Sequence, residues 1–241
     1  MWQILVREFN SYLNSLIAYV VIGIFITSIG LLMWVFPDTS VLEYGYADMN
    51  TLFSLGPFVF MFLIPAITMR TFAEEKRSGT LELLYTRPVS DWEIIIGKII
   101  SSWLLSAIAI LLSSVYYFSL YQLSSPIGNI DSSGIAGSYI GFILLAGVFT
   151  SIGVLASSVT SSQIVAFVLA VFFSFILYSG LNSFSMLFSG EVQLWIEQLS
   201  LIHHYEAMSR GVIDIKNIVY LISVMVLVTT VTKTVLESRK W

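Results

Sequence analysis

The pair Gly97-Lys98 is the part of this sequence that comes nearest to a nucleotide-binding motif. A phosphate-binding loop has another glycine five residues before the Gly-Lys pair and a serine or threonine directly after it, which contacts Mg²⁺. Here Trp92 and Ile99 occupy those two positions. We therefore expect that this chain binds no ATP by itself.

Two other groups of residues could in principle do chemistry. His203, His204 and Glu206 are close in sequence, but adjacent histidines point to different faces of a helix or strand, and no H-E-x-x-H spacing is present. We interpret them as polar residues at a membrane surface rather than metal ligands. The many serines have no positioned base near them in sequence, and the chain has no cysteine. We expect no catalytic, cofactor or metal site in this chain.

The strongest concentration of charge is the stretch Arg70–Lys98, RTFAEEKRSGTLELLYTRPVSDWEIIIGK, which lies between two long apolar runs. Such a stretch has to lie in water between two membrane spans. One interpretation is an ordinary solvated loop with a mixed charge face. The alternative is a folded structure on the cytoplasmic side, and the local sequence signals of this stretch favour this second interpretation.

Those signals predict two helices joined by a corner. Gly79 or Thr80 can cap a short first helix, and Pro88 stops it because the residue before a proline is pushed out of the helical region. Ser90 and Glu93 fit a capping box, so the second helix begins at Asp91 and continues into the membrane. The apolar face of the first helix, held out in the aqueous phase, combines Leu81, Leu84 and Tyr85.

Composition sets the environment of the rest of the chain. Hydrophobic residues make up 57% of the 241, charged residues only 11%, and the mean hydropathy is +0.88. These values are typical of an integral membrane protein and leave no room for a large soluble domain. The net charge of −4 gives no basic field for nucleic acid. We expect one all-α membrane domain over residues 1–241, surrounded by the lipid bilayer.

The hydropathy pattern predicts six transmembrane helices. An amphipathic helix over residues 1–15 should rest in the membrane interface as an elbow before the first span. The coupling segment 70–98 joins the second and third spans, and short amphipathic outer helices within 185–214 should cap the bundle between the fifth and sixth. The expected spans are residues 17–36, 51–69, 99–123, 135–156, 164–184 and 217–232.

The fourth predicted span contains the GxxxG pair Gly137 and Gly141. Two glycines at this spacing leave one helix face small enough for close approach by another helix. The alternative is that they are incidental, since glycine is common in membrane helices. From Asp131 to Glu191 no ionisable side chain other than tyrosine occurs, which makes an independent ion-coupled carrier unexpected.

The basic residues predict the orientation, because cytoplasmic loops carry an excess of lysine and arginine. If the coupling segment is cytoplasmic, both termini are cytoplasmic and only Arg210 and Lys216 are outside. The other nine of the eleven basic residues are then inside: Arg7, Arg70, Lys76, Arg77, Arg87, Lys98, Lys233, Arg239 and Lys240.

The order of these features resembles a known family. Six spans, an N-terminal elbow and the pattern E-x-x-x-G-T-x-E-x-L, formed by Glu75, Gly79, Thr80, Glu82 and Leu84, together resemble an ABC-2 type ABC transporter permease. Several further phrases resemble one branch, the gliding-motility (GldF-type) permease subunits. They are SLGPFVFMFLIPAITMRTF, SPIGNID, GSYIG, TSIGVLASSVTSSQIVAF and SRGVIDIKNIVYLIS.

The resemblance implies a subunit of the cytoplasmic (inner) membrane that couples ATP hydrolysis by a separate cytoplasmic ABC ATPase, which binds ATP and Mg²⁺, to export or conformational change. It also implies a second membrane subunit, either a distinct one with a periplasmic domain or a second copy of this chain. A rival function is a non-transporting module that transmits force or a signal to a periplasmic partner. The coupling helix would be about 79–87, with Gly79, Thr80, Leu81, Glu82, Leu84, Tyr85 and Arg87 contacting the ATPase.

Overall fold

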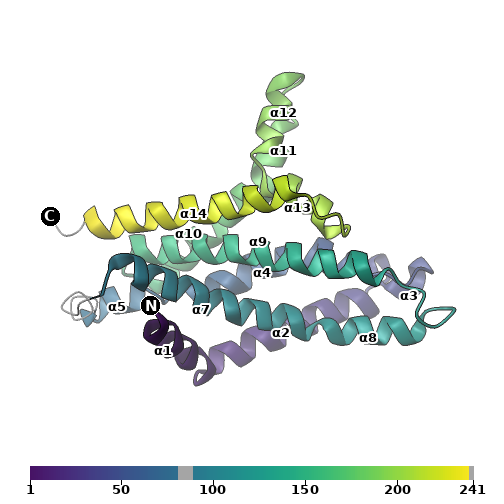
Figure 1. The fold of residues 1–241 in the computed structure, drawn as a ribbon, viewed down its shortest axis with the longest axis horizontal. Helices are drawn as coiled ribbons and strands as arrows, with labels where there is room; N and C mark the ends of the chain where they lie inside the picture. Colours follow the sequence, from purple (N-terminus) through teal and green to yellow (C-terminus); the bar gives the residue numbers. More distant parts are fainter. Residues whose placement is uncertain (81–88, 239–241) are drawn as a thin grey trace.

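In the computed structural model, which describes residues 1–80 and 89–238, every regular element in those ranges is a helix (Figure 1). The first half contains α1 (Trp2–Leu13), α2 (Leu16–Trp34), η1 (Pro37–Thr39), α3 (Val41–Tyr44), α4 (Asn50–Thr68), α5 (Ala73–Arg77), α7 (Asp91–Leu112) and α8 (Ser114–Leu123). The second half contains α9 (Ser132–Val159), α10 (Gln163–Phe175), η2 (Ile176–Gly180), α11 (Leu181–Ser185), α12 (Glu191–Gln198), α13 (Leu201–Ser209) and α14 (Ile215–Glu237).

Across the described ranges, six helices are long and apolar enough to cross a membrane, which confirms the predicted all-α fold with six spans. The sixth predicted span, 217–232, lies inside a longer helix that continues to Glu237, and the third, 99–123, lies inside a helical stretch that begins at Asp91. The six candidates are Leu16–Trp34, Asn50–Arg77, Asp91–Leu123, Ser132–Val159, Gln163–Ser185 and Ile215–Glu237.

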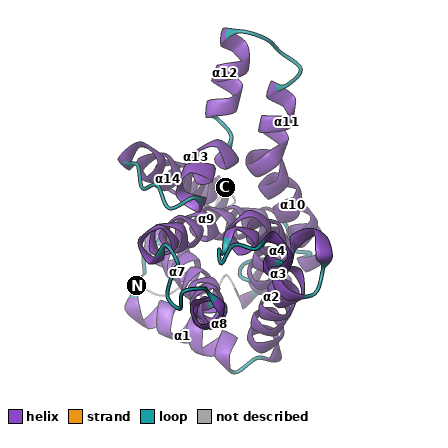
Figure 2. Ribbon diagram, turned by 90° about the vertical axis from the view of Figure 1, so that its right-hand side faces the viewer, coloured by secondary structure: helices purple, strands orange, loops and turns teal. Residues whose placement is uncertain are grey.

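Helix α9 is the centre of the bundle. It packs against α4, α7, α10, α13 and α14, and Figure 2, which looks along the bundle, shows these helices arranged around it. Its most apolar window is 78% buried inside the protein, against 17% for α14 and 22% for the α10–α11 span. The flanking helices therefore leave most of their apolar surface to lipid or to another membrane subunit.

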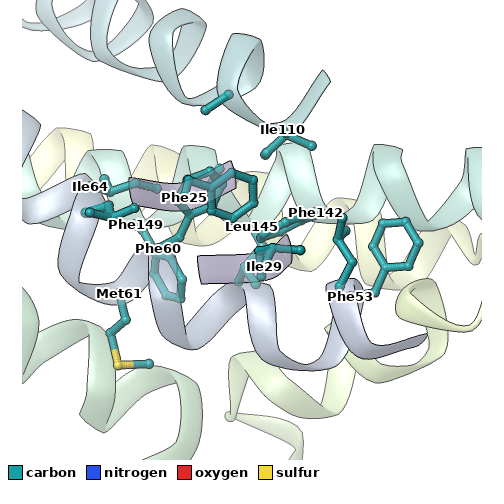
Figure 3. Packing of buried hydrophobic residues seen from close by; sticks show 14 of the residues in the cluster. Phe25, Ile29, Phe53, Phe60, Met61, Ile64, Ile110, Phe142, Leu145 and Phe149 are labelled. Carbon is teal, nitrogen blue, oxygen red and sulfur yellow. The ribbon is translucent and has the colours of Figure 1, made fainter. Parts of the chain in front are cut away.

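The main core contains a group of aromatic rings packed against one another (Figure 3). Phe25 of α2 stacks on Phe60 of α4 with ring centroids 4.2 Å apart, and Phe142 of α9 lies 5.1 Å from Phe60. All three side chains are fully buried. Aromatic rings bury a large apolar area and prefer such stacked or tilted contacts. This cluster therefore holds α2, α4 and α9 against one another.

A second, smaller apolar cluster lies at the end of the bundle where the chain passes from α4 to α7. It joins side chains from α1, α7, α9 and α14 with the turn before α5: Ile4, Phe72, Ile94, Ile95, Ile99, Val154 and Leu236. We call this end, formed by α1, α5 and the start of α7, the charged end. Figure 1 shows α5, the start of α1 and the end of α14 towards this same end.

The predicted fifth span does not continue straight through the bundle. After α10, the five-residue π turn η2 redirects the chain, and α11 with α12 forms an arm that stands away from the bundle at a steep angle to its long axis (Figures 1 and 2). The expectation that the whole 185–214 segment caps the bundle is therefore wrong for α12. It is right for α13, which packs on α4, α9 and α14.

Candidate functional site

The turn between α4 and α5 is fixed from below by a single hydroxyl of α9. Ser157 Oγ accepts hydrogen bonds from the backbone N–H groups of Phe72 and Ala73, both at 3.0 Å, and donates one to the carbonyl of Met69 at 2.9 Å. Ser157 is completely buried. Helix ends leave backbone groups without partners, so one side chain here satisfies three of them at the junction.

The start of α7 is fixed locally. Ser90 Oγ accepts from the N–H of Glu93, and the Glu93 carboxylate accepts from the N–H of Ser90. This is the predicted capping box, and α7 begins at Asp91 as expected. The two ends of the coupling segment, at α5 and α7, are therefore each set in a defined position.

Lys98 joins these two ends. Its side chain is only 1% exposed, and its ammonium donates to Glu75 Oε1 of α5 at 2.8 Å, to the Thr71 carbonyl at 2.8 Å and to Glu8 Oε1 of α1 at 3.3 Å. An ammonium has three N–H groups, so all of its donors are used. Phe72 places its ring 5.0 Å from the same nitrogen. One buried cation thus connects α1, α5 and α7.

A second cation covers the same carboxylates from the outside. Arg7 of α1 lies 2.6 Å from Glu8 Oε1 and 3.6 Å from Glu75 Oε1. Burial alone would raise the pKa of the Glu8 carboxyl, but the positive charges of Lys98 and Arg7 outweigh it and hold that pKa below its ordinary value. Glu8 is therefore ionised at neutral pH, as its ion pairs require.

Helix α1 lies directly on α7 at this place. A side chain on Gly97 would bring its Cβ within 3.0 Å of Ile4 and 3.5 Å of the backbone nitrogen of Leu5, so the glycine permits the close approach. The face of α1 that packs inward carries Ile4, Leu5, Glu8 and Tyr12. Trp2 of the same helix lies outside this face and is 72% exposed.

A cavity of about 610 Å³ opens beside the ion pairs. Arg70 lies on one side, where it donates to Ser15 Oγ at 3.1 Å and lies over the Tyr12 ring. The cavity reaches Thr80, the last described residue before the gap at 81–88. Its walls are Arg7, Glu8, Ser11, Tyr12, Arg70, Thr71, Glu74, Glu75, Ser78 and Thr80.

The predicted coupling residues fall partly inside the described ranges. Gly79 follows α5 with φ of +70°, the left-handed backbone that favours glycine, and Ser78 Oγ lies 2.9 Å from Thr80 Oγ1. The remaining predicted contacts lie outside the described residues: Leu81, Glu82, Leu84, Tyr85 and Arg87.

Gly137 and Gly141 are elsewhere in the fold. A Cβ on Gly137 would lie 2.8 Å from the carbonyl oxygen of Gly211, and one on Gly141 would lie 2.6 Å from Met208 Cβ. Both glycines thus let α13 and the chain that follows it approach α9 closely, at the end of the bundle opposite to the charged end. The GxxxG pattern lies against a short helix instead of against a second transmembrane helix.

The two histidines take part in separate contacts near α13. His203 Nδ1 lies 3.3 Å from Glu197 Oε1, while His204 stacks on Tyr220 and lies 2.9 Å from both Asn217 Oδ1 and the Gln198 carbonyl. Among the described residues, no three histidine, aspartate or glutamate side chains are grouped as metal ligands.

Sequence reasoning did not identify Glu8, Arg7 and Ser157 as parts of the site. The available signals were a lysine eight residues into a membrane helix and a Glu-Arg pair on an amphipathic helix, but nothing local links them, since Glu8 and Lys98 are 90 residues apart. Chemically, the arrangement is a set of ion pairs and hydrogen bonds that connects α1, α5, α7 and α9. It is suited to transmit a displacement of the coupling segment to the helices that anchor it.

The chain was compared with models of protein families and with curated proteins. The family described as ABC-2 family transporter protein matches residues 38–238. No curated protein matches the chain.

Proposed function

This chain belongs to the ABC-2 family of transporter proteins, and from that premise we propose that it couples ATP hydrolysis by a separate ATPase subunit to movement of its six spans. ABC-2 permeases are multi-pass membrane subunits that work with an ATPase subunit. We propose that coupling occurs at the segment between α4 and α7, at the charged end, and that this end lies in the cytoplasm.

The observation that carries the proposal is the three-way connection made by Lys98. A displacement of the segment reaches α5 and α7 first, because these helices are its two ends. Glu75 on α5 and Lys98 on α7 form an ion pair at 2.8 Å, and Glu8 on α1 joins the same ammonium. Because both partners are shielded from water, the pair resists separation more than an exposed one would. α1, α5 and α7 are therefore expected to move together.

Ser157 extends the connection to the centre of the bundle. It bonds the turn before α5 to α9, and the Lys76 ammonium donates to the carbonyl of Ser158 on the same helix. Since α9 is the helix around which the others pack, a displacement at the charged end is passed to the core and not only to the two helices that flank the segment.

We further propose that the transporter is of the gliding-motility type, in the cytoplasmic membrane, with ATP and Mg²⁺ bound by the ATPase and none by this chain. Phrases of sequence spread from residue 54 to 223 support this branch. Six spans form half of a pathway, so a second membrane subunit is required. The lightly buried α10 and α14 offer the surface for it, whether it is a distinct subunit or a second copy.

The direct test is co-purification of the chain with its ATPase from its own membranes, followed by ATP turnover in lipid nanodiscs. The triple variant Leu81→Ala/Leu84→Ala/Tyr85→Ala should lose the ATPase, because apolar anchors dominate such docking surfaces. Lys98→Met should instead retain the ATPase but uncouple its turnover from movement of the spans. Spin labels attached to single cysteines introduced into α4 and α10 would report that movement. Since the chain has no native cysteine, only the introduced positions would be labelled.

Leu187→Ala is a matched control, since Leu187 is a 76% exposed leucine on the arm, distant from the charged end. It should leave ATPase association unchanged. Retention of the ATPase by the triple variant would show that the coupling helix is not the docking element. Full coupling in Lys98→Met would show that the ion pairs do not carry the displacement.

A further inference from the structure

Helix α4 contains Pro57, and a side chain from α13 supplies the hydrogen bond that this proline cannot make. Proline has no backbone N–H, so the carbonyl of Phe53, one turn earlier, loses its ordinary helical partner. The hydroxyl of Tyr205 donates to that carbonyl at 2.8 Å. Both residues are buried, with 2% of Tyr205 and 1% of Phe53 exposed. In a membrane helix, a freed carbonyl has to be satisfied by a neighbour, and Tyr205 is that neighbour.

The fifth span contains an irregular turn, and the segment around α13 makes a hydrogen bond to it as well. The π turn Ile176–Gly180 interrupts the regular α-helical hydrogen bonding where the chain leaves the bundle. Within it, the carbonyl of Tyr178 accepts a hydrogen bond from Ser200 Oγ at 2.9 Å. Ser200 is completely buried and is the residue directly before α13.

These two bonds belong to one cluster. The Tyr178 ring contacts Tyr205, with centroids 6.3 Å apart, and it meets Phe58, the residue after Pro57, edge to face at 5.5 Å. Helix α4, next to Pro57, and the π turn after α10 therefore contact each other. Ser200 and Tyr205 each donate a hydrogen bond to one carbonyl of these two elements. We call Phe53, Tyr178, Ser200 and Tyr205 the hinge cluster.

We propose that Ser200 and Tyr205 form a latch that holds the Pro57 region of α4 and the π turn after α10 in one relative position, so that the two spans rearrange together and only when α13 shifts. The inference rests on the proposed function, since it names the part of the permease that controls its rearrangement at the end opposite to the coupling segment. The arm reaches the latch directly, because α12 ends at Gln198, two residues before Ser200.

Local packing alone would give a different result from a latch. If each hydroxyl only satisfied its own carbonyl, removing one would loosen only the helix that carries that carbonyl. If the cluster works as a unit, removing the Tyr205 hydroxyl loosens α10 as well as α4, and removing the Ser200 hydroxyl loosens α4 as well as α10. Cross-effects of this kind separate the two possibilities.

The experiment measures backbone hydrogen exchange by mass spectrometry on the full chain in lipid nanodiscs. In Tyr205→Phe, amides of residues 54–61 and of residues 176–182 should both exchange about tenfold faster, because a buried carbonyl without a partner strongly favours opening. Ser200→Ala should produce the same double response. Amides of α7 should keep their native rate.

Tyr116→Phe is the matched control. The Tyr116 hydroxyl also donates to a span carbonyl, that of Ile26 at 2.6 Å, but residue 30, one turn on, is a glycine that supplies the ordinary helical N–H. Its removal orphans no carbonyl, so exchange in the hinge cluster should stay native.

The most decisive variant combines Tyr205→Phe with Pro57→Ala. Alanine restores the N–H that Phe53 lacks, so the Tyr205 hydroxyl becomes redundant and the tenfold effect should fall to less than about twofold. An equal effect of Tyr205→Phe in both backgrounds, or faster exchange confined to residues 54–61, would overturn the latch. Neither result depends on ATPase binding, so the proposed function is tested separately by co-purification.

Discussion

The two ends of the bundle hold interrupted spans in place by different kinds of interaction. At the charged end, the junction between α4, α5 and α7 is held by a buried ammonium with two carboxylates. At the opposite end, the Pro57 region of α4 and the π turn after α10 are held by neutral hydroxyls that donate to single carbonyls. The difference follows from the surroundings, since ionic groups are very costly within hydrocarbon and hydroxyls are not.

The comparison shows where each kind of movement is favoured. Removing one member of a buried ion pair leaves an uncompensated charge, whereas removing a hydroxyl leaves one neutral carbonyl. The charged end should therefore move as a unit with its pairs intact. The hinge cluster should open more readily than the charged end, because losing a neutral hydrogen bond costs less free energy than separating a buried ion pair.

The largest expected effect comes from Lys98→Met, which keeps the volume of the side chain and removes its charge. Glu8 and Glu75 would then face each other with Arg7 as their remaining cation, and the free energy of unfolding should fall by about 3 kcal/mol. The thermal unfolding midpoint in nanodiscs measures this loss. A midpoint equal to that of the native chain would show that the pair has no role in stability.

Two variants sharpen that result. Lys233→Met removes a lysine from an exposed pair with Glu237, where the side chains are 28% and 45% exposed, and should cost less than about 0.5 kcal/mol. The triple variant Lys98→Met/Glu8→Gln/Glu75→Gln should recover most of the loss, because no buried charge remains unpaired. Failure to recover would mean that Lys98 acts by packing and not by its charge.

An intermediate effect is expected for Ser157→Ala. The substitution leaves the N–H groups of Phe72 and Ala73 buried without an acceptor and should lower the free energy of unfolding by about 2 kcal/mol. Ser151→Ala is the control on the same helix, because the Ser151 hydroxyl donates only to the Gly147 carbonyl of α9 itself and its loss orphans no N–H. If both variants unfold at the same temperature, Ser157 does not anchor the α4–α5 turn.

The sequence predicts the elements that depend on neighbouring residues. The spans are continuous apolar runs, and the capping box of Ser90 and Glu93 spans four residues, so each pattern is complete within a short window. The start of α7 was therefore predicted to the residue. Lys98 shows the limit, since its partners lie 23 and 90 residues away and no local pattern pairs them.

The arm shows a second limit. Residues 164–184 form one apolar run, and composition cannot distinguish a straight span from one that bends halfway. In the folded chain, Ser200 supplies a hydrogen bond to the π turn from 22 residues away. Tyr205 similarly compensates for a proline 148 residues earlier in the chain. The side chain that donates to the carbonyl freed by this proline could be identified only in the folded chain.

The smallest effect is a response to acid at the charged end. The pKa of Glu8 is below its ordinary value of 4.5 in the folded protein, so its ionised form stabilises the fold above the unfolded pKa. That contribution is lost as the pH falls through the lower, folded value. It is small because burial opposes the attraction of Lys98 and Arg7 and cancels part of it. The unfolding midpoint should therefore drop between about pH 5 and about pH 2 by more in the native chain than in Glu8→Gln. Glu191→Gln, which changes a carboxylate on the exposed arm, should keep the native drop. If Glu8→Gln and Glu191→Gln respond equally to acid, Glu8 does not contribute through its charge, and the contrast between an ionic end and a neutral end would rest on Lys98 and Glu75 alone.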